Sequence, residues 1–331
     1  MAPEDRLQIW VSRAGLTLAV VVALAAPLSM NGYHLYQATQ VLIYMIALIG
    51  LNLLTGYNGQ ISLGHGAFFA IGGYGAAILS SRFGLPFWAA IPLASSVCFV
   101  AGFLFGFPAL KLGGLYLALA TFALAVAAPQ ILSYKGFDAW TGGAQGLQIV
   151  KLQAPAWTHL DPDQWIFVVA LAAAALLVWV ALNLVRGRIG RALVAIRDHG
   201  LAAETMGVDA ALYKTTAFGV SALYAGVAGG LSAFAVGFVS PESFGLALSL
   251  AFLVGVVVGG LASVGGAIFG ALFIEFVPNY ADRLSMQFGE SAKALPGAIY
   301  GLLLIAIMGI APAGVAGLAR ALVRRASRLS L

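Results

Sequence analysis

Charged residues are scarce in this chain. Only 9% of its 331 residues are Asp, Glu, Lys or Arg, whereas 61% are hydrophobic. Soluble domains carry about 25% charged residues, and a soluble fold could not hide this much apolar surface, because its surface grows too fast relative to its volume. A lipid bilayer removes that problem by acting as the solvent. The composition therefore predicts an all-α polytopic membrane protein.

Other absences narrow the function. A single cysteine, Cys98, excludes an intrachain disulfide. No Gly-Lys pair occurs anywhere, so a phosphate-binding loop of the G-x-x-x-x-G-K-[ST] type is excluded and ATP-driven work must come from another polypeptide. The chain also lacks an H-E-x-x-H motif, a cysteine pair and converging intramembrane carboxylates, which ranks a membrane-embedded enzyme last. The net charge of +5 is interpreted as topological, not as nucleic-acid binding.

Ten apolar runs are predicted to cross the bilayer, for which about 20 residues suffice. Several are short and rich in glycine, of which the chain has 41. The runs are residues 14–30, 38–54, 67–80, 87–107, 115–133, 165–185, 215–236, 246–261, 265–278 and 294–310. The first has a second interpretation as a signal peptide, because Arg6 and Arg13 precede it and small residues follow at 23–25. We favour an uncleaved first helix.

The distribution of basic residues predicts the orientation. Ten spans with a cytoplasmic N-terminus place twelve of the 17 Lys and Arg residues inside, as the positive-inside rule requires. Both termini are then cytoplasmic, with residues 1–13 at one end and a basic tail, 318–331, beside anionic lipid. Residues 134–164 form an external loop and residues 186–213 a cytoplasmic loop. Neither loop is long enough for an enzyme domain, so residues 1–331 are predicted to form a single transmembrane domain.

A polar, glycine-rich segment follows the second run. Residues 55–66 read TGYNGQISLGHG, and irregular backbone at membrane depth survives only when it is buried in protein or lines a wet cavity. One interpretation is a broken element beside a translocation path, with Asn58, Gln60, Ser62 and His65 as path candidates. The other is a cytoplasmic turn with a small-residue packing face. His65 alone is better explained as a packed or capping histidine than as a proton carrier.

Two weaker signals lie later in the chain. Residues 259–266 join two short runs on the same predicted side, and the tripeptide at 263–265 aligns with that at 62–64, which hints at an internal repeat. Glu275 lies within the ninth run and is a further path candidate, since an intramembrane acid is a functional candidate by default. Its position near the interface also allows it simply to reach water.

The cytoplasmic segment is predicted to contain a surface helix. Residues 192–196 place apolar side chains on one face between basic residues, Asp198 is expected to cap a following short helix, and Gly207 to end it. The segment is either an interfacial helix held by lipid headgroups or a docking helix for a cytoplasmic partner. The residues alone do not separate these two.

Taken together, these residues resemble the permease subunits of branched-chain amino-acid ABC importers, specifically the M-type subunit. The resemblance covers about residues 36–314. Its most specific part is residues 51–75, and the stretches 115–122, 190–198 and 308–314 support it.

The resemblance implies a fold similar to the ten-helix importers of the cobalamin type, in a bacterial inner membrane. It implies a second related permease, two ATPase subunits that carry ATP and Mg, an external binding protein, and no cofactor on this chain. It also implies that an ATPase-coupling loop contains Arg197, Asp198, Ala202, Ala203, Glu204 and Gly207.

Two rival functions remain. Urea or short-amide importers have similar permeases, and selectivity rests largely with the binding protein. A secondary transporter or channel is the second rival, but it would place ionisable residues in mid-membrane, where the insertion cost is about 2.5–3.5 kcal/mol each. The charges of this chain avoid the predicted spans almost completely.

Overall fold

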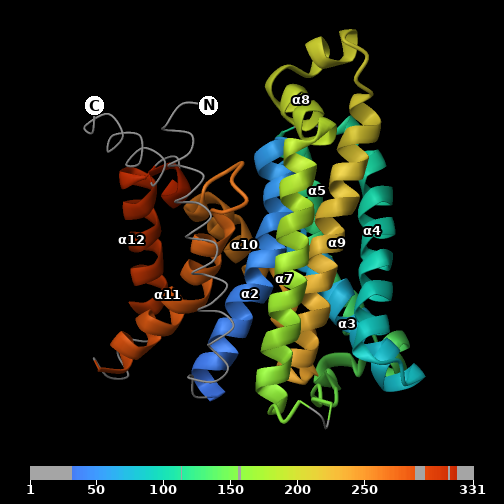
Figure 1. The fold of residues 1–331 in the computed structure, drawn as a ribbon, viewed down its shortest axis with the longest axis vertical. Coiled ribbons are helices and arrows are strands. Elements are labelled where there is room, and N and C mark those ends of the chain that lie inside the picture. Colours follow the sequence, from blue (N-terminus) through green and yellow to red (C-terminus); the bar gives the residue numbers. More distant parts are fainter. Residues whose placement is uncertain (1–31, 113, 156–157, 288–294, 312–313, 319–331) are drawn as a thin grey trace.

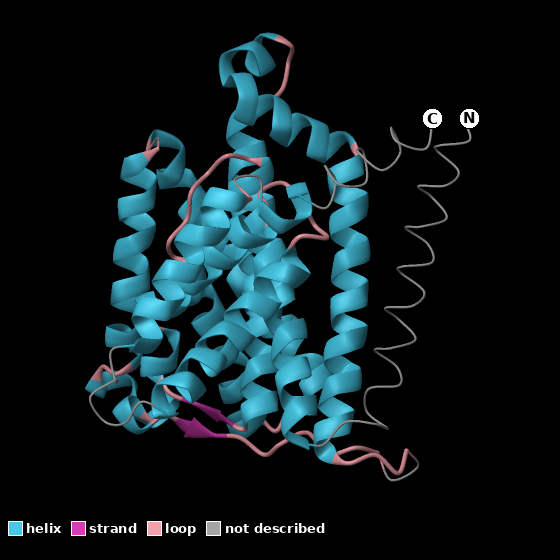
Figure 2. Ribbon diagram, turned by 90° about the vertical axis from the view of Figure 1, so that its left-hand side faces the viewer, coloured by secondary structure: helices cyan, strands magenta, loops and turns pink. Residues whose placement is uncertain are grey.

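A computed structural model describes residues 32–112, 114–155, 158–287, 295–311 and 314–318. The described chain is a bundle of long helices, with one pair of two-residue strands (Figures 1 and 2). The long helices are α2 (Gly32–Asn52), α3 (His65–Phe83), α4 (Phe87–Lys111), α5 (Leu115–Leu132), α7 (Pro162–Arg186), α8 (Arg188–Thr205), α9 (Ala210–Val236), α10 (Leu246–Gly259), α11 (Ala267–Gln287) and α12 (Leu295–Ile310).

Nine of the ten predicted spans correspond to helices in the described ranges. The first, 14–30, and both predicted cytoplasmic termini fall outside them, apart from Leu318 at the edge of the tail. Two helices extend well beyond the apolar runs. α2 begins at Gly32, six residues before its run, and α11 continues to Gln287, nine residues beyond its own. Polar residues in these outer turns ended the runs without ending the helices.

Six helical segments are long and apolar enough to cross a membrane. They contain α2, α4, α5, α7, α9 and α10. α12 has only 16 residues in the structure, a rise of about 24 Å against a hydrocarbon core of about 30 Å. The described part of the chain is therefore an all-helical polytopic bundle, apart from the short strand pair.

α9 lies at the centre of the bundle and packs against α2, α3 and α4. Small residues let these helices approach backbone to backbone. A Cβ built on Gly72 of α3 would collide with the backbone of Gly226 in α9, and one built on Gly229 would collide with the carbonyl of Phe69. The abundance of glycine is thus explained in part by contacts between α3 and α9.

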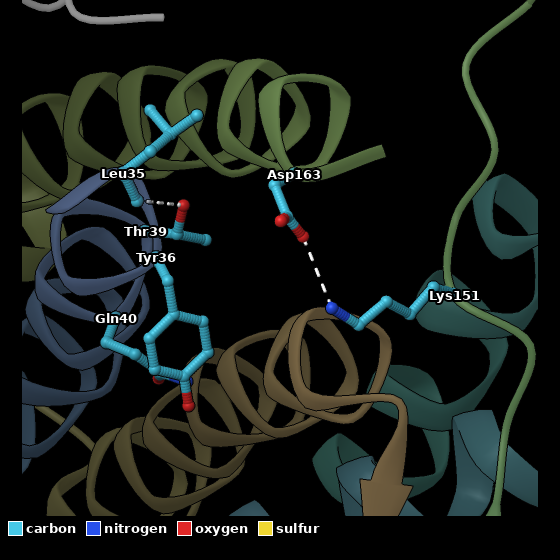
Figure 3. Close-up of polar contacts among 6 residues, drawn as sticks. All are labelled: Leu35, Tyr36, Thr39, Gln40, Lys151 and Asp163. Atoms are coloured by element: carbon cyan, nitrogen blue, oxygen red, sulfur yellow. Dashed lines mark hydrogen bonds and ion pairs between the residues drawn. The ribbon is translucent and has the colours of Figure 1, made fainter. Parts of the chain in front are cut away.

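The predicted external loop is structured. It contains the 3-10 turns η2 (Lys135–Phe137) and η3 (Gly143–Gln145), the short helix α6 (Asp138–Thr141), and strand β1 (Leu147–Gln148). β1 pairs antiparallel with β2 (Phe238–Val239), which follows α9. An ion pair of 3.3 Å joins Lys151 to Asp163 in the first turn of α7 (Figure 3).

α8 lies at the opposite end of the bundle from the strand pair (Figures 1 and 2). The first turn of α7 carries a capping box formed by Asp161 and Gln164, with Pro162 at the first helical position. α7 then runs the length of the bundle to the start of α8 (Figure 1). The two segments predicted to lie outside the membrane are therefore held at opposite ends.

Candidate functional site

The polar segment after α2 is irregular and buried. α2 ends in a π-helical turn, η1 (Leu53–Tyr57), and regular structure resumes only at His65. Within the gap, Asn58 Nδ2 donates to Gln60 Oε1 at 2.8 Å, and the Gln60 N–H donates to the Leu54 carbonyl at 3.1 Å. Asn58, Gln60, Ser62 and His65 are all at most 8% exposed. The polar side chains of the segment are thus enclosed by protein, although Gly59 and Ile61 are exposed, and such burial is the condition under which irregular backbone persists at membrane depth.

Neighbouring helices fix the start of α3. The Gly66 N–H donates to Ser249 Oγ of α10 at 3.0 Å, and the Leu63 N–H donates to Thr121 Oγ1 of α5 at 2.9 Å. His65 Nε2 lies 2.9 Å from the Ala47 carbonyl, and its ring meets Phe252 edge-on. Because Ala47 lies five residues before the end of α2, α3 begins inside the bundle and not at its surface.

Asn52 was missed by the sequence analysis. This residue ends α2, is 2% exposed, and binds the loop between α10 and α11. Its Nδ2 donates to the carbonyls of Ser263 at 3.0 Å and Gly260 at 3.3 Å, and its Oδ1 accepts from the Ala262 N–H at 2.9 Å. A Cβ built on Gly56 would also meet the Ala262 backbone, so the segments 55–66 and 259–266 lie side by side. A polar residue at the end of an apolar run, directly before a glycine-rich segment, was the available signal.

Removing the Asn52 amide is expected to destabilise the protein. Asn52→Ala leaves three backbone groups of the 260–263 loop without their partner, and each buried unsatisfied group costs about 1–3 kcal/mol. We expect a loss of about 2–4 kcal/mol, measured as a lower midpoint of thermal unfolding in detergent. The control is Asn183→Ala, because Asn183 is exposed on α7. Equal midpoints for the two variants would contradict the role of Asn52.

α8 consists of two helical segments joined at His199, whose φ of −151° and ψ of 82° are not helical. The first segment is amphipathic, with Leu193 and Ile196 buried. The prediction that Asp198 caps the second segment is wrong for the described residues. Its carboxylate instead pairs with Arg197 Nε at 2.9 Å. Gly207 ends the segment as predicted, with a φ of +83° and an N–H donated to the Glu204 carbonyl at 3.0 Å.

Residues 201–207, which include the end of α8 and are called the tip of α8 below, are mostly exposed and carry two large apolar side chains. Leu201 is 83% exposed and Met206 is 85% exposed. Of the predicted coupling residues, Ala202, Glu204 and Gly207 are also exposed, whereas Ala203 packs with Ile196 and Ala210.

Arg197 joins α8 to the irregular segment. Its Nη1 donates to the Gly56 carbonyl at 2.7 Å, across 141 positions of sequence. Its aliphatic stem also packs against Gly59, where the φ of +74° and the closeness of the stem favour glycine. Two groups of candidates that the sequence analysis kept separate, the coupling loop and the segment 58–65, are therefore in direct contact.

Glu275 belongs to a different part of the bundle. It is 9% exposed on α11, and its side chain accepts from Asn279 Nδ2 at 3.3 Å. Within the described residues, no hydrogen bond joins it to the irregular segment. Among the described residues, Asn58 binds Gln60, whereas Ser62 and His65 lie further along the same segment with other partners, and Glu275 is apart from all four.

Long apolar helices around a buried, irregular polar segment, with an amphipathic helix clamped to that segment at one end, define a polytopic membrane transport protein. Residues 33–308 match the family described as branched-chain amino acid transport system / permease component. The chain belongs to this family. The match confirms the predicted class, a membrane permease component and not an enzyme.

Two LivM proteins match 88% of the chain. It is 35% identical over 313 residues to the high-affinity branched-chain amino acid transport system permease protein LivM of Salmonella typhimurium, covering 88% of this chain and 72% of the relative. The LivM protein of Escherichia coli is 34% identical over the same shares. The autoinducer 2 import system permease protein LsrC of Photorhabdus laumondii is 29% identical over only 133 residues, 38% of each chain.

A solved structure also resembles the chain. PsaBC from Streptococcus pneumoniae in complex with Fab is 15% identical, with a TM-score of 0.41, covering 87% of this chain and 95% of that one.

Proposed function

We propose that this chain is the M-type membrane-spanning subunit of an ABC importer for leucine, isoleucine and valine. A second related permease completes the path, two cytoplasmic ATPase subunits bind ATP and Mg, and an external binding protein delivers the substrate. The proposal rests on the family match, on the two LivM relatives that cover most of the chain, and on the connection between α8 and the irregular segment.

The hydrogen bond from Arg197 to the Gly56 carbonyl is the observation that carries the mechanism. A partner that moves α8 displaces Gly56 with it, because the contact is short, charge-assisted and packed against Gly59. Asn52 extends the connection to the 260–263 loop. Closure of an ATPase dimer below the tip of α8 would then move the ends of α2, α10 and α11 together, as a rigid-body shift.

The irregular segment supports the transport role. Asn58, Gln60, Ser62 and His65 are its proposed path residues, and Asn58 Oδ1 is buried without a partner among the described residues. Few polar groups, part of them unsatisfied, suit a small ligand that is held briefly and released. Urea and short amides remain the second candidate substrates, and thermal-shift screening of the cognate binding protein with leucine, isoleucine, valine and urea distinguishes the two classes.

For topology, we propose ten spans with both termini in the cytoplasm of a bacterial inner membrane. The nine predicted spans that correspond to helices, the placement of α8 and the strand pair at opposite ends, and the basic residues of α8 support this arrangement. A fold of the cobalamin-importer type remains part of the proposal.

The exposed tip of α8 is the proposed ATPase contact. Leu201→Asp with Met206→Asp places two charges where the apolar side chains are 83% and 85% exposed. We expect co-purification of the ATPase to fall at least about tenfold, since a desolvated carboxylate at an interface costs more than about 1.4 kcal/mol. Leu212→Asp is the control, because Leu212 is exposed in the first turn of α9, where an acidic residue suits the helix N-terminus. Full ATPase retention by the double variant would contradict the assignment.

A further inference from the structure

A polar cavity lies between α2 and α11 at the end of the bundle opposite α8. It measures about 80 Å³ and is lined by His34, Gln37, Phe276, Asn279, Tyr280 and Arg283. α2 and α11 pack against each other. The family assignment does not account for a cavity lined by an arginine, a histidine, two amides and two aromatic rings at this position.

Glu275 does not line the cavity itself but is hydrogen-bonded to Asn279, which does. Asn279 lines the cavity and donates to the Glu275 carboxylate at 3.3 Å. Side chains on a helix lean toward its N-terminus, so Asn279 and Arg283 both project back toward Glu275. α11 thus carries an acid, an amide and a cation at successive turns, in that order from the membrane interior outward.

No cation among the described residues is paired with the buried Glu275. In the described ranges the ion pairs are Lys151 with Asp163 and Arg197 with Asp198, so neither includes this carboxylate. A buried charge is normally paired, and an intramembrane acid that is not paired marks a functional position. The one hydrogen bond from Asn279 leaves most of the acceptor capacity of a carboxylate unused.

A polar stripe on α2 faces the same region. Gln40 Nε2 donates to the Tyr36 hydroxyl at 2.9 Å (Figure 3), while Gln40 Oε1 is buried and accepts from no residue that the structure describes. Tyr44, one turn further along α2, lies close enough to interact electrostatically with both Glu275 and Tyr36. Among the described residues, no cation is paired with either of two buried acceptors, Glu275 and Gln40 Oε1.

We propose that this cavity is an outer binding site for the zwitterionic head of an α-amino acid. The Glu275 carboxylate binds the α-ammonium group, Arg283 at the rim binds the α-carboxylate, and Phe276 and Tyr280 contact the aliphatic side chain. The inference rests on the proposed import function and adds a substrate class, because urea and amides carry no such pair of charges. An anionic lipid headgroup shares only the Arg283 chemistry.

The test is leucine uptake by the assembled transporter in proteoliposomes. Glu275→Gln keeps an oxygen for Asn279 and removes the charge. We expect at least a tenfold lower uptake for this variant and for Arg283→Gln, because truncating one side of a buried charge pair has effects of at least this size. Arg283→Lys keeps the positive charge and should retain most of the uptake. Glu242→Gln is the control, because Glu242 is an exposed carboxylate outside the cavity.

Saturation-transfer NMR with leucine on the transporter in nanodiscs gives the second readout. We expect the signal to disappear in Glu275→Gln and to be absent for isoamylamine and 4-methylpentanoate, which each lack one charge. If Glu275→Gln left both leucine uptake and leucine binding unchanged, the inference would be overturned and the import function would stand. If the wild type took up no leucine, the import function itself would be contradicted. If Arg283→Gln altered only the dependence on anionic lipid, Arg283 would be a headgroup contact and the proposed site would be wrong.

Discussion

Replacing Arg197 with alanine is expected to reduce ATP-driven leucine uptake by about ten- to a hundredfold while leaving the subunits assembled. The guanidinium donates to the Gly56 carbonyl at 2.7 Å, and hydrogen bonds to charged groups contribute about 1.5–3 kcal/mol. The substitution removes this contact but leaves the exposed tip of α8 unchanged. ATP hydrolysis should therefore continue while transport falls, and the ratio of transported leucine to hydrolysed ATP is the quantity to measure.

Arg191→Ala is the matched control for this experiment. Arg191 lies on the same segment of α8, but it is exposed and its Nη1 donates only to the Arg186 carbonyl nearby in sequence. Its loss should leave the transport ratio within about twofold of the wild type, as is usual for exposed charges. A normal ratio in Arg197→Ala, or an equal decrease in both variants, would show that α8 does not act through Gly56.

The second large effect is expected at the contact between α3 and α9. In Gly229→Val, the new side chain would enter the space of the Phe69 carbonyl, and the Cβ alone would also meet the Gly73 backbone. Backbone on both sides cannot move aside as a flexible side chain can, so overpacking should cost at least about 3 kcal/mol. We expect most of the protein to be lost from the monodisperse peak in size-exclusion chromatography, with a lower unfolding midpoint for the remainder.

Gly301→Val in α12 is the control for overpacking, because a Cβ there meets no atom of the described residues within 4 Å. Its elution profile should match that of the wild type. If Gly229→Val behaved like this control, α3 and α9 would not approach as closely as the structure shows.

The apolar runs predicted the positions of nine helices well, because insertion into a bilayer depends on local composition. α4, α5 and α10 begin at their predicted residues. α2 and α11 were predicted too short because polar side chains such as Gln37 and Asn279 sit inside helices, where a neighbouring helix or cavity accommodates them. A hydropathy pattern carries no information about such tertiary compensation.

The candidate site was only partly predictable for the same reason. Asn58, Gln60 and Ser62 stood out as polar residues in an apolar context, and they are buried as a broken element requires. The contacts of Asn52 with residues 260–263 and of Arg197 with Gly56 span 208–211 and 141 positions, respectively. Local spacing cannot predict such pairings. The role of Asp198 as a cap was mispredicted because Arg197, its direct neighbour, competes for the carboxylate.

The central claim is that this chain transports substrate only as part of an ATP-driven complex. Its most direct test measures labelled leucine uptake into proteoliposomes that contain the chain alone, or the chain with its second permease, its ATPase subunits and its binding protein. We predict uptake only by the full set, with a strict requirement for ATP. Leucine uptake by the chain alone, without ATP, would contradict the claim.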